Sequence, residues 1–358
     1  MSYGHSVRFL KRFAVTPYIV SHPWILSQRV QRALTKRKHA EFFAPTDYEP
    51  SETKLNRLAA FKASETPELA ITNSRQWQEI VNKGTVFIAG GDIIWNPNNE
   101  VPGKFFLDFA VEAGLPCFSY GTSIGALELP ASYGRRYRRY LAAFIAVGVR
   151  EAASIEMLRP YYKGTLRQVV DPTLLLTSEQ WDEFAGRAEA SFMTAQEEFI
   201  LCYFVMEDED YWRYVAEAVS DLHLPVVVLP MHARDGRAEG YTILDDAAPY
   251  EFVWLVKHAS VVITDSFHVC SFCLTYEKEF YLLRRSRKSE DSKYDEFLGR
   301  YLLQDRSITH GVAFEQNPCV YGPAARERLD RDRSASIAFL KAALDEIDSS
   351  REKTYGPE

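Results

Sequence analysis

The chain has 358 residues, of which 46% are hydrophobic and 25% are charged, a composition typical of soluble globular proteins. This length exceeds what one hydrophobic core usually organises, so we expect two domains. The net charge of −7 argues against a general nucleic-acid-binding protein, since such proteins carry an excess of basic residues. The five cysteines are irregularly spaced, which argues against a disulfide framework and favours a reducing, cytoplasmic setting.

The amino-terminal region contains no run of the ~20 apolar residues that a membrane span needs. The stretch 13–26 is partly apolar but is interrupted by two prolines and a histidine, so it predicts neither a membrane helix nor a signal peptide. A basic run follows, and on an amphipathic helix over 27–43 it would contact the anionic inner face of a membrane. A solvated helix face is the alternative interpretation. The run comprises Arg29, Arg32, Lys36, Arg37 and Lys38.

Apolar strands alternate with amphipathic helices from residue 85 onward, which predicts an α/β fold with parallel, doubly wound sheets. Before this point we expect a short strand over 69–71 and a helix that begins at Ser74. The first alternation predicts strands over 85–89, 116–120, 144–149 and 169–170, and helices over 104–114, 135–141 and 151–158.

A polar helix over 178–195 connects to a second alternation of the same kind. We therefore expect one domain over 1–180, a second over 181–330, and a carboxyl-terminal amphipathic helix and tail over 331–358. The second alternation predicts strands over 199–203, 225–229, 261–264 and 280–283, helices over 211–222 and 251–258, and a last helix over 334–348.

The stretch 261–268 carries the strongest local signal. Its β-branched start predicts a buried strand, and Asp265 or Ser266 then caps a helix that has His268 in its first turn. The free N–H groups and the dipole at a helix start attract an anion. A histidine there can bind a phosphate or transfer a proton near neutral pH. A histidine that only completes the helix start is the alternative.

Polar and glycine residues also follow the other predicted strands, where open α/β sheets bind their ligands. Two facing domains would bring both sets together across a cleft. For any one of these residues, a structural role in a cap or turn is the alternative. The set comprises Gly90, Gly91, Asp92, Gly121, Thr122, Arg150, Glu151, Pro230, His232, Asp265, Ser266, His268, Arg284 and Arg285.

The pair Cys270 and Cys273 has the spacing of a redox or zinc motif. No second cysteine pair or His-x-His motif lies near it, and its neighbours Phe272 and Leu274 are apolar. We therefore predict buried helix packing and no metal site.

Several of these segments, in this order and spacing, resemble the polysaccharide pyruvyl transferase family over roughly residues 40–310. They are Gly91-Asp92-Ile93-Ile94-Trp95-Asn96-Pro97, Ser119-Tyr120-Gly121, Val149-Arg150-Glu151, Asp171-Pro172-Thr173-Leu174-Leu175, Pro249-Tyr250-Glu251-Phe252, Thr264-Asp265-Ser266-Phe267-His268, Leu283-Arg284-Arg285, and Phe297-Leu298 to Asp305-Arg306. The resemblance implies two facing Rossmann-like domains in a GT-B-like arrangement. It also implies transfer of a pyruvyl group from phosphoenolpyruvate to sugar hydroxyls, usually closing a cyclic ketal.

The same resemblance implies that Arg150 and His268 belong to the donor site. Phosphoenolpyruvate carries a carboxylate and a phosphate, which arginine binds bidentately. Protonation of the enol carbon and attack by a hydroxyl require an acid and a base. We assign His268 to one role and Asp92 to activation of the hydroxyl. The predicted substrate-binding residues are Arg150, Arg284, Arg285, Ser266, Phe267, Asp265, Gly91 and Gly121.

The expected partners are phosphoenolpyruvate, which is the donor substrate rather than a cofactor, and a glycan or lipid-linked sugar acceptor. The second domain would hold the donor and the first domain the acceptor. The expected setting is exopolysaccharide or cell-surface glycan biosynthesis in the cytoplasm, at the inner face of the membrane. The sequence leaves the acceptor sugar and the oligomeric state open.

The chain departs from the family pattern in two places. Val269 follows the motif histidine where the family usually has glycine, and we expect its branched side chain to narrow the site. At the amino terminus, Ser2-Tyr3-Gly4 stands where the family has a strand and an Asn-x-Gly loop.

Two other functions fit the same architecture. A nucleotide-sugar glycosyltransferase would need a carboxylate on the ribose, and Glu251 could supply it. A catalytically inactive glycan-binding homologue would accommodate both departures. The ligand that raises the melting temperature discriminates among these functions.

Overall fold

The computed structural model describes residues 48–66, 74–82, 86–97, 99, 102–126, 128–189, 198–206, 208–232, 235, 240–284 and 291–355. The predicted helix over 27–43, the predicted strand over 69–71, Ser2-Tyr3-Gly4 and Arg285 lie outside these ranges.

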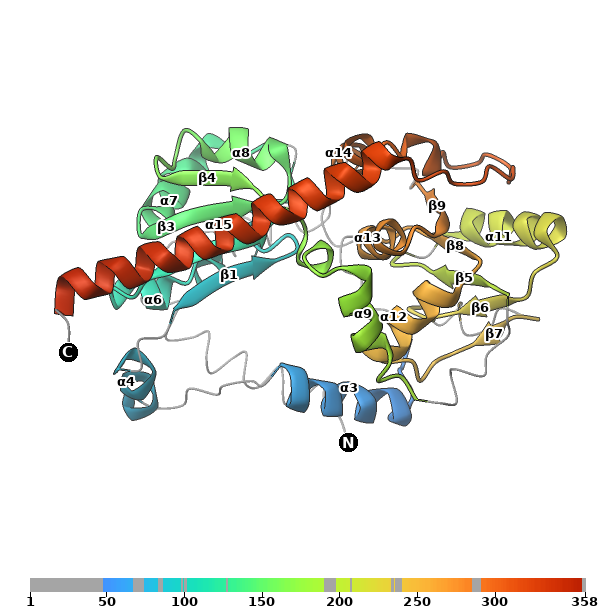
Figure 1. The fold of residues 1–358 in the computed structure, drawn as a ribbon, viewed down its shortest axis with the longest axis horizontal. Coiled ribbons are helices and arrows are strands. Elements are labelled where there is room, and N and C mark those ends of the chain that lie inside the picture. The colour runs from blue at the N-terminus through green and yellow to red at the C-terminus, as the bar shows by residue number, and fades with distance from the viewer. Residues whose placement is uncertain are drawn as a thin grey trace, which may run out of the picture.

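The described residues form two parallel β-sheets, each with helices on both faces (Figure 1). This confirms the predicted α/β class. The first sheet has the order β1 (Phe87–Gly91), β2 (Cys117–Thr122), β3 (Phe144–Val149) and β4 (Thr165–Gln168). The second has the order β10 (Ser307–Ile308), β9 (Glu279–Leu283), β8 (Val261–Thr264), β5 (Ile200–Tyr203), β6 (Val226–Val228) and β7 (Thr242–Ile243). We call the first sheet with its helices the first half and the second sheet with its helices the second half.

The second sheet is doubly wound about the neighbouring strands β5 and β8. From β5 the chain proceeds to β6 and β7 on one side, then returns to β8 and continues to β9 and β10 on the other. Alternate residues of β5 therefore face opposite cores. Ile200 packs toward α11 (Glu209–Leu222), and Leu201 packs toward α12 (Pro249–His258) and α13 (Phe267–Tyr276). Such a reversal of strand order is where α/β sheets form ligand crevices.

The first sheet carries different helices on its two faces. Tyr137 of α7 (Ala131–Leu141) and Leu158 of α8 (Ala152–Leu158) pack on one face. The other face is covered by α15 (Pro323–Tyr355), through Phe339, Ala343 and Ile347. The predicted helix over 334–348 is therefore part of a 33-residue helix. It begins beside the second half and runs across to the first sheet (Figure 1).

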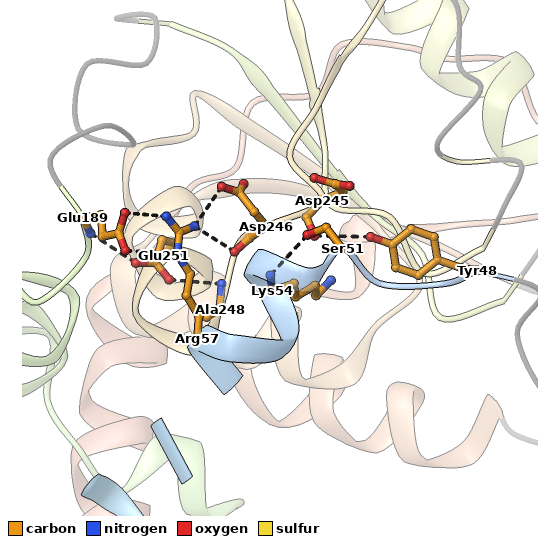
Figure 2. Close-up of polar contacts among 9 residues, drawn as sticks. All are labelled: Tyr48, Ser51, Lys54, Arg57, Glu189, Asp245, Asp246, Ala248 and Glu251. Atoms are coloured by element: carbon orange, nitrogen blue, oxygen red, sulfur yellow. Dashed lines mark hydrogen bonds and ion pairs between the residues drawn. The ribbon is translucent and has the colours of Figure 1, made fainter. Parts of the chain in front are cut away.

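The helix α3 (Glu52–Glu65) precedes the first sheet in sequence but packs on the second half. The Phe61 ring lies 5.3 Å from the Tyr250 ring. Arg57 donates to Asp246 at 2.9 Å and also pairs with Glu189 (Figure 2). The following helix α4 (Ser74–Asn82) returns to the first half, where Trp77 contacts Phe87 and Phe109. Part of the predicted first domain thus contacts the second half, and the division near residue 180 stays a prediction.

Several predicted elements have different bounds in the structure. The strand predicted over 169–170 is wrong. β4 ends at Gln168, and Val170 donates its N–H to Ser336 of α15 instead of to a strand. The helix predicted over 104–114 is divided into α5 (Pro102–Phe105) and α6 (Asp108–Glu112), because Leu107 between them has φ +53.

Of the helix predicted over 178–195, the structure describes α9 (Ser178–Ala185), which is capped by Gly186, and residues 190–195 lie outside the described ranges. The strands β7 and β10 and the helix α14 (Asp291–Tyr301) were not predicted. None of the helices in the described ranges combines the length and apolar composition that crossing a membrane requires.

Candidate active site between the two halves

The β8–α13 junction has the predicted strand–cap–helix geometry. Every residue of β8 is buried, and Ser266 caps α13 by accepting the N–H of Val269 at 3.5 Å. In the first turn, the backbone N–H groups of Phe267 and His268 have no acceptor among the described residues. The His268 side chain is 44% exposed. This helix start therefore combines two available N–H donors with an imidazole.

Asp265 lies at the same junction but is buried and holds the scaffold. One carboxylate oxygen accepts the N–H of Val205 at 2.6 Å, and the other accepts that of Met206 at 3.1 Å. Asp265 thus ties the loop after β5 to the end of β8. Both oxygens are used by the backbone, so its predicted contact with substrate has no support in this geometry.

Arg150 follows β3 in the first half and is almost fully buried, with 5% of its side chain exposed. Its Nη1 pairs with Asp171 and its Nη2 with Asp92. Burial acts against the charge of Arg150, but Asp171, Asp92 and Glu151 outweigh it and hold the pKa above its ordinary value. The Nε–H is buried and meets no acceptor among the described residues. The Arg150 side chain is therefore fixed by two carboxylates, and its Nε–H is the donor without an acceptor among the described residues.

Asp171 is the residue of this site that the sequence analysis did not single out. It follows β4 and caps the short 3₁₀ helix η1 (Pro172–Leu174), where Oδ1 accepts from the N–H and hydroxyl of Thr173 at 2.9 and 2.7 Å. Its Oδ2 pairs with Arg150 and lies 3.7 Å from Nε2 of His268 in the second half. Burial acts to raise its pKa, but Arg150, His268 and Thr173 prevail and lower it. The Asp-Pro-Thr capping sequence was the available signal.

Both predicted glycines have backbone conformations that favour glycine. Gly91 ends β1 directly before Asp92 and has φ +138. Gly121 has φ +61, and a Cβ there would lie 3.1 Å from Pro172 and 3.8 Å from the Arg150 side chain. The absence of a side chain at Gly121 therefore allows η1 and Arg150 to pack against β2.

Arg284, at the end of β9, is directed toward α14. Its Nη2 donates to Asp295 at 3.0 Å, and its guanidinium lies 5.3 Å from the Tyr294 ring. Like His268 and Asp92, it is not among the residues that line the cavity described below. Its predicted role at the donor therefore depends on a rearrangement that these contacts do not suggest.

The unpredicted helix α14 joins the second half to the first. Glu296 accepts the N–H of Ala152, at the start of α8, at 2.8 Å, and also accepts from the Gln168 side chain. Lys293 places its Nζ 6.0 Å from the Phe267 ring, whose centre is also 5.8 Å from the Arg150 guanidinium carbon. The apolar spacing of Tyr294, Phe297, Leu298 and Tyr301 is the helical signal that could have revealed this element.

A cavity of about 40 Å³ lies between the two halves. It is partly open to solvent, and its enclosed part holds a few water molecules. Burial raises the pKa of Glu151 on its wall, against the opposing effects of Arg150, Ser123 and Ser154. The cavity is lined by Arg150, Glu151, Gln168, Val169, Val170, Asp171 and Leu174 from the first side and by Phe267, Lys293, Glu296, Phe297, Arg300 and Tyr301 from the second.

Val269 does not crowd this cavity. Its side chain is fully buried in the core between the second sheet and α12–α13, while His268 points out of that core. The expectation that Val269 narrows the site is therefore wrong. Cys270 and Cys273 are also fully buried in this core, which agrees with the predicted packing role.

Glu251, which a ribose-binding function would require, is buried and satisfied. It accepts the N–H of Ala248 at 3.0 Å and that of Glu189 at 3.1 Å. Figure 2 shows α3 beside these groups, with Arg57 close to Glu189. In the part of the chain that the structure describes, no group of three or more His, Cys, Asp or Glu residues could hold a metal ion.

Comparisons with known proteins place this geometry in context. The sequence matches the family model described as polysaccharide pyruvyl transferase over residues 25–287. None of the curated proteins matches the sequence.

Solved structures with similar folds include two UDP-GlcNAc 2-epimerases. The one from Methanocaldococcus jannaschii is 13% identical, with 76% of this chain and 80% of that chain covered and a TM-score of 0.46. The one from Rickettsia bellii is 10% identical, with 79% and 80% covered and a TM-score of 0.43. The glycotransferase of kitacinnamycin is 13% identical, with 77% and 78% covered and a TM-score of 0.41.

Proposed function

Because the chain belongs to the polysaccharide pyruvyl transferase family, we propose that it transfers a pyruvyl group from phosphoenolpyruvate to hydroxyls of a glycan or lipid-linked sugar. One observation carries this proposal beyond family membership. Arg150 of the first half and His268 of the second half meet at the Asp171 carboxylate, beside a helix start with available N–H donors. The site is thus built from both halves.

The donor would bind at the start of α13. The N–H groups of Phe267 and His268 suit a phosphate, because they add to the positive end of the helix dipole. Arg150, whose buried Nε–H has no acceptor among the described residues, and Lys293 both line the cavity and suit the donor carboxylate.

The chemistry assigns His268 as the acid. His268 protonates the methylene carbon of the enol, which leaves an oxocarbenium-like centre at the neighbouring carbon. A sugar hydroxyl attacks that carbon while its proton passes to a base. The bond from the carbon to the phosphate oxygen then breaks, and phosphate leaves as hydrogen phosphate with the proton that the base took up. A second hydroxyl attacks the same carbon, closes the ketal and passes its proton to His268. The balanced products are the ketal and inorganic phosphate.

Asp92 is our assignment for the base that activates the hydroxyl. Its carboxylate pairs with Arg150 through one oxygen, and its side chain is 35% exposed at the end of β1. An acceptor approaching from the first half could therefore reach it. The acceptor would be a polysaccharide precursor in the cytoplasm or at the inner membrane face.

The buried Glu251 weighs against the nucleotide-sugar alternative, because both of its oxygens accept backbone N–H groups. The buried Val269 removes one reason to expect an inactive homologue.

The direct test is phosphate release from phosphoenolpyruvate with a panel of free and lipid-linked glycans. We expect release that depends on the acceptor, and a melting temperature raised by phosphoenolpyruvate but not by UDP-sugars. Failure of every acceptor together with no thermal response to phosphoenolpyruvate would refute the proposed function. A response to a UDP-sugar alone would favour the glycosyltransferase.

A further inference from the structure

We infer that Asp171 is a positioning residue, which stabilises a protonated His268 only when the two halves are joined. This inference deepens the proposed function and rests on it for its catalytic meaning. Asp171 belongs to the first half and His268 to the second, and 3.7 Å separates Oδ2 from Nε2. The acid of the second half would therefore receive its counter-charge from the first.

The two oxygens of Asp171 do different work. Oδ1 is used by the N–H and hydroxyl of Thr173, which fixes the carboxylate at the start of η1. Oδ2 faces Arg150 and His268. With only 2% of its side chain exposed, the carboxylate cannot rotate freely to another partner. Capping of η1 requires only Oδ1. The position of Oδ2, between Arg150 and His268, is therefore the evidence for a role beyond capping.

Among the described residues, Asp171 is the carboxylate that forms an ion pair with His268. Glu151, on the same cavity wall, accepts the hydroxyl of Ser154 at 3.1 Å. The helix α13 carries no other charged side chain. Arg150 is held by Asp171 and by Asp92. From α14, Glu296 is engaged by Ala152 and Gln168, Arg300 is paired with Asp332, and Lys293 lies beside the Phe267 ring.

The physical consequence follows from distance. A carboxylate within ~4 Å favours the charged form of an imidazole. Separation of the halves would move the two groups apart and remove this effect. The proton needed by the enol would then be held ready only in the joined arrangement, which limits its loss to water.

The variant Asp171→Asn tests this inference, because it removes the charge but keeps an oxygen for Thr173. The protonated form of His268, which is the acid, disappears as pH rises. Without the Asp171 carboxylate it should disappear at a lower pH. We expect phosphate release to fall more on the alkaline side than on the acidic side. The control Thr173→Val should lower the melting temperature without moving the profile. A loss by the same factor at every pH would overturn the inference.

A second measurement does not depend on the reaction. Diethyl pyrocarbonate modifies histidine in its neutral form and not in its charged form. The rate of His268 modification at about pH 6, measured by peptide mass spectrometry, therefore reports how often His268 is unprotonated. We expect faster modification of His268 in Asp171→Asn than in the parent, with the other histidines unchanged. An unchanged rate would overturn the inference. A faster rate in a protein that releases no phosphate would uphold the pairing while refuting the proposed function.

Discussion

His268 Nε2 lies 3.7 Å from Asp171 Oδ2, although the two residues follow strands of different sheets. Through Asp171 the histidine is also connected to Arg150 and hence to Asp92. The predicted acid, the predicted base and the predicted donor arginine thus form one chain of charged contacts.

His268→Ala should abolish transfer and leave the fold intact. The side chain is 44% exposed, so its loss creates no buried cavity, whereas the reaction loses its acid. Phosphate release and melting temperature on the same sample check both parts. Turnover equal to that of the parent would remove His268 from the mechanism.

Arg150→Ala should impair both donor binding and folding. The substitution leaves the buried Asp171 without its cation, and breaking such a pair typically costs about 3–5 kcal/mol. Thermal unfolding and a donor titration should both change. Arg150→Lys restores the charge but not the two-pronged geometry, so we expect partial recovery of stability and weak donor binding. Full donor affinity in the lysine variant would contradict a role for the Nε–H.

Val269→Gly should destabilise the protein without raising activity. The side chain is fully buried, so its removal opens a cavity and adds a helix-propensity cost of about 1 kcal/mol. A lower melting temperature with unchanged or reduced phosphate release is expected. A gain in turnover would restore the idea that Val269 crowds the donor.

Arg57→Ala should weaken the attachment of α3. Its side chain is 16% exposed and pairs with both Asp246 and Glu189, and loss of such charged hydrogen bonds typically costs about 1–3 kcal/mol. Arg75→Ala on α4 is the matched control, because its ion pair with Glu79 is highly exposed and should matter little. Equal melting temperatures for the two variants would show that the Arg57 contacts do not hold α3.

The stability of the protein should depend on the ionisation of Asp171. The pKa of this carboxyl is lowered in the folded state, so its stabilising effect is present above its ordinary pKa of 3.8 and is lost as pH falls through the lowered value. Urea unfolding of the parent and Asp171→Asn, at neutral and at acidic pH, checks this. The difference in unfolding free energy should shrink in acid, and a constant difference would argue against it.

Local sequence patterns predicted the β8–α13 junction well, because a buried strand, a cap and a helix are specified by adjacent residues. Asp171 was missed since its importance comes from Arg150 and His268, which only the tertiary structure brings together. The strands β7 and β10 are two residues long, too short to carry a periodic pattern. Arg150 directly follows a strand, as predicted, but its two carboxylate partners were not predicted, because ion pairs across a fold leave no spacing to detect.

The reciprocal placement of α3 and α15 means that the chain is interleaved. The early helix packs against α9 and α12 of the second half, and the last helix covers Phe118 and Ala146 of the first sheet. A fragment ending near residue 180 would expose the face that α15 covers, and the complementary fragment would lack α3. Exposed apolar faces of this kind promote aggregation. Neither fragment should therefore behave as an autonomous folding unit, and the two together should complement each other only when mixed during refolding.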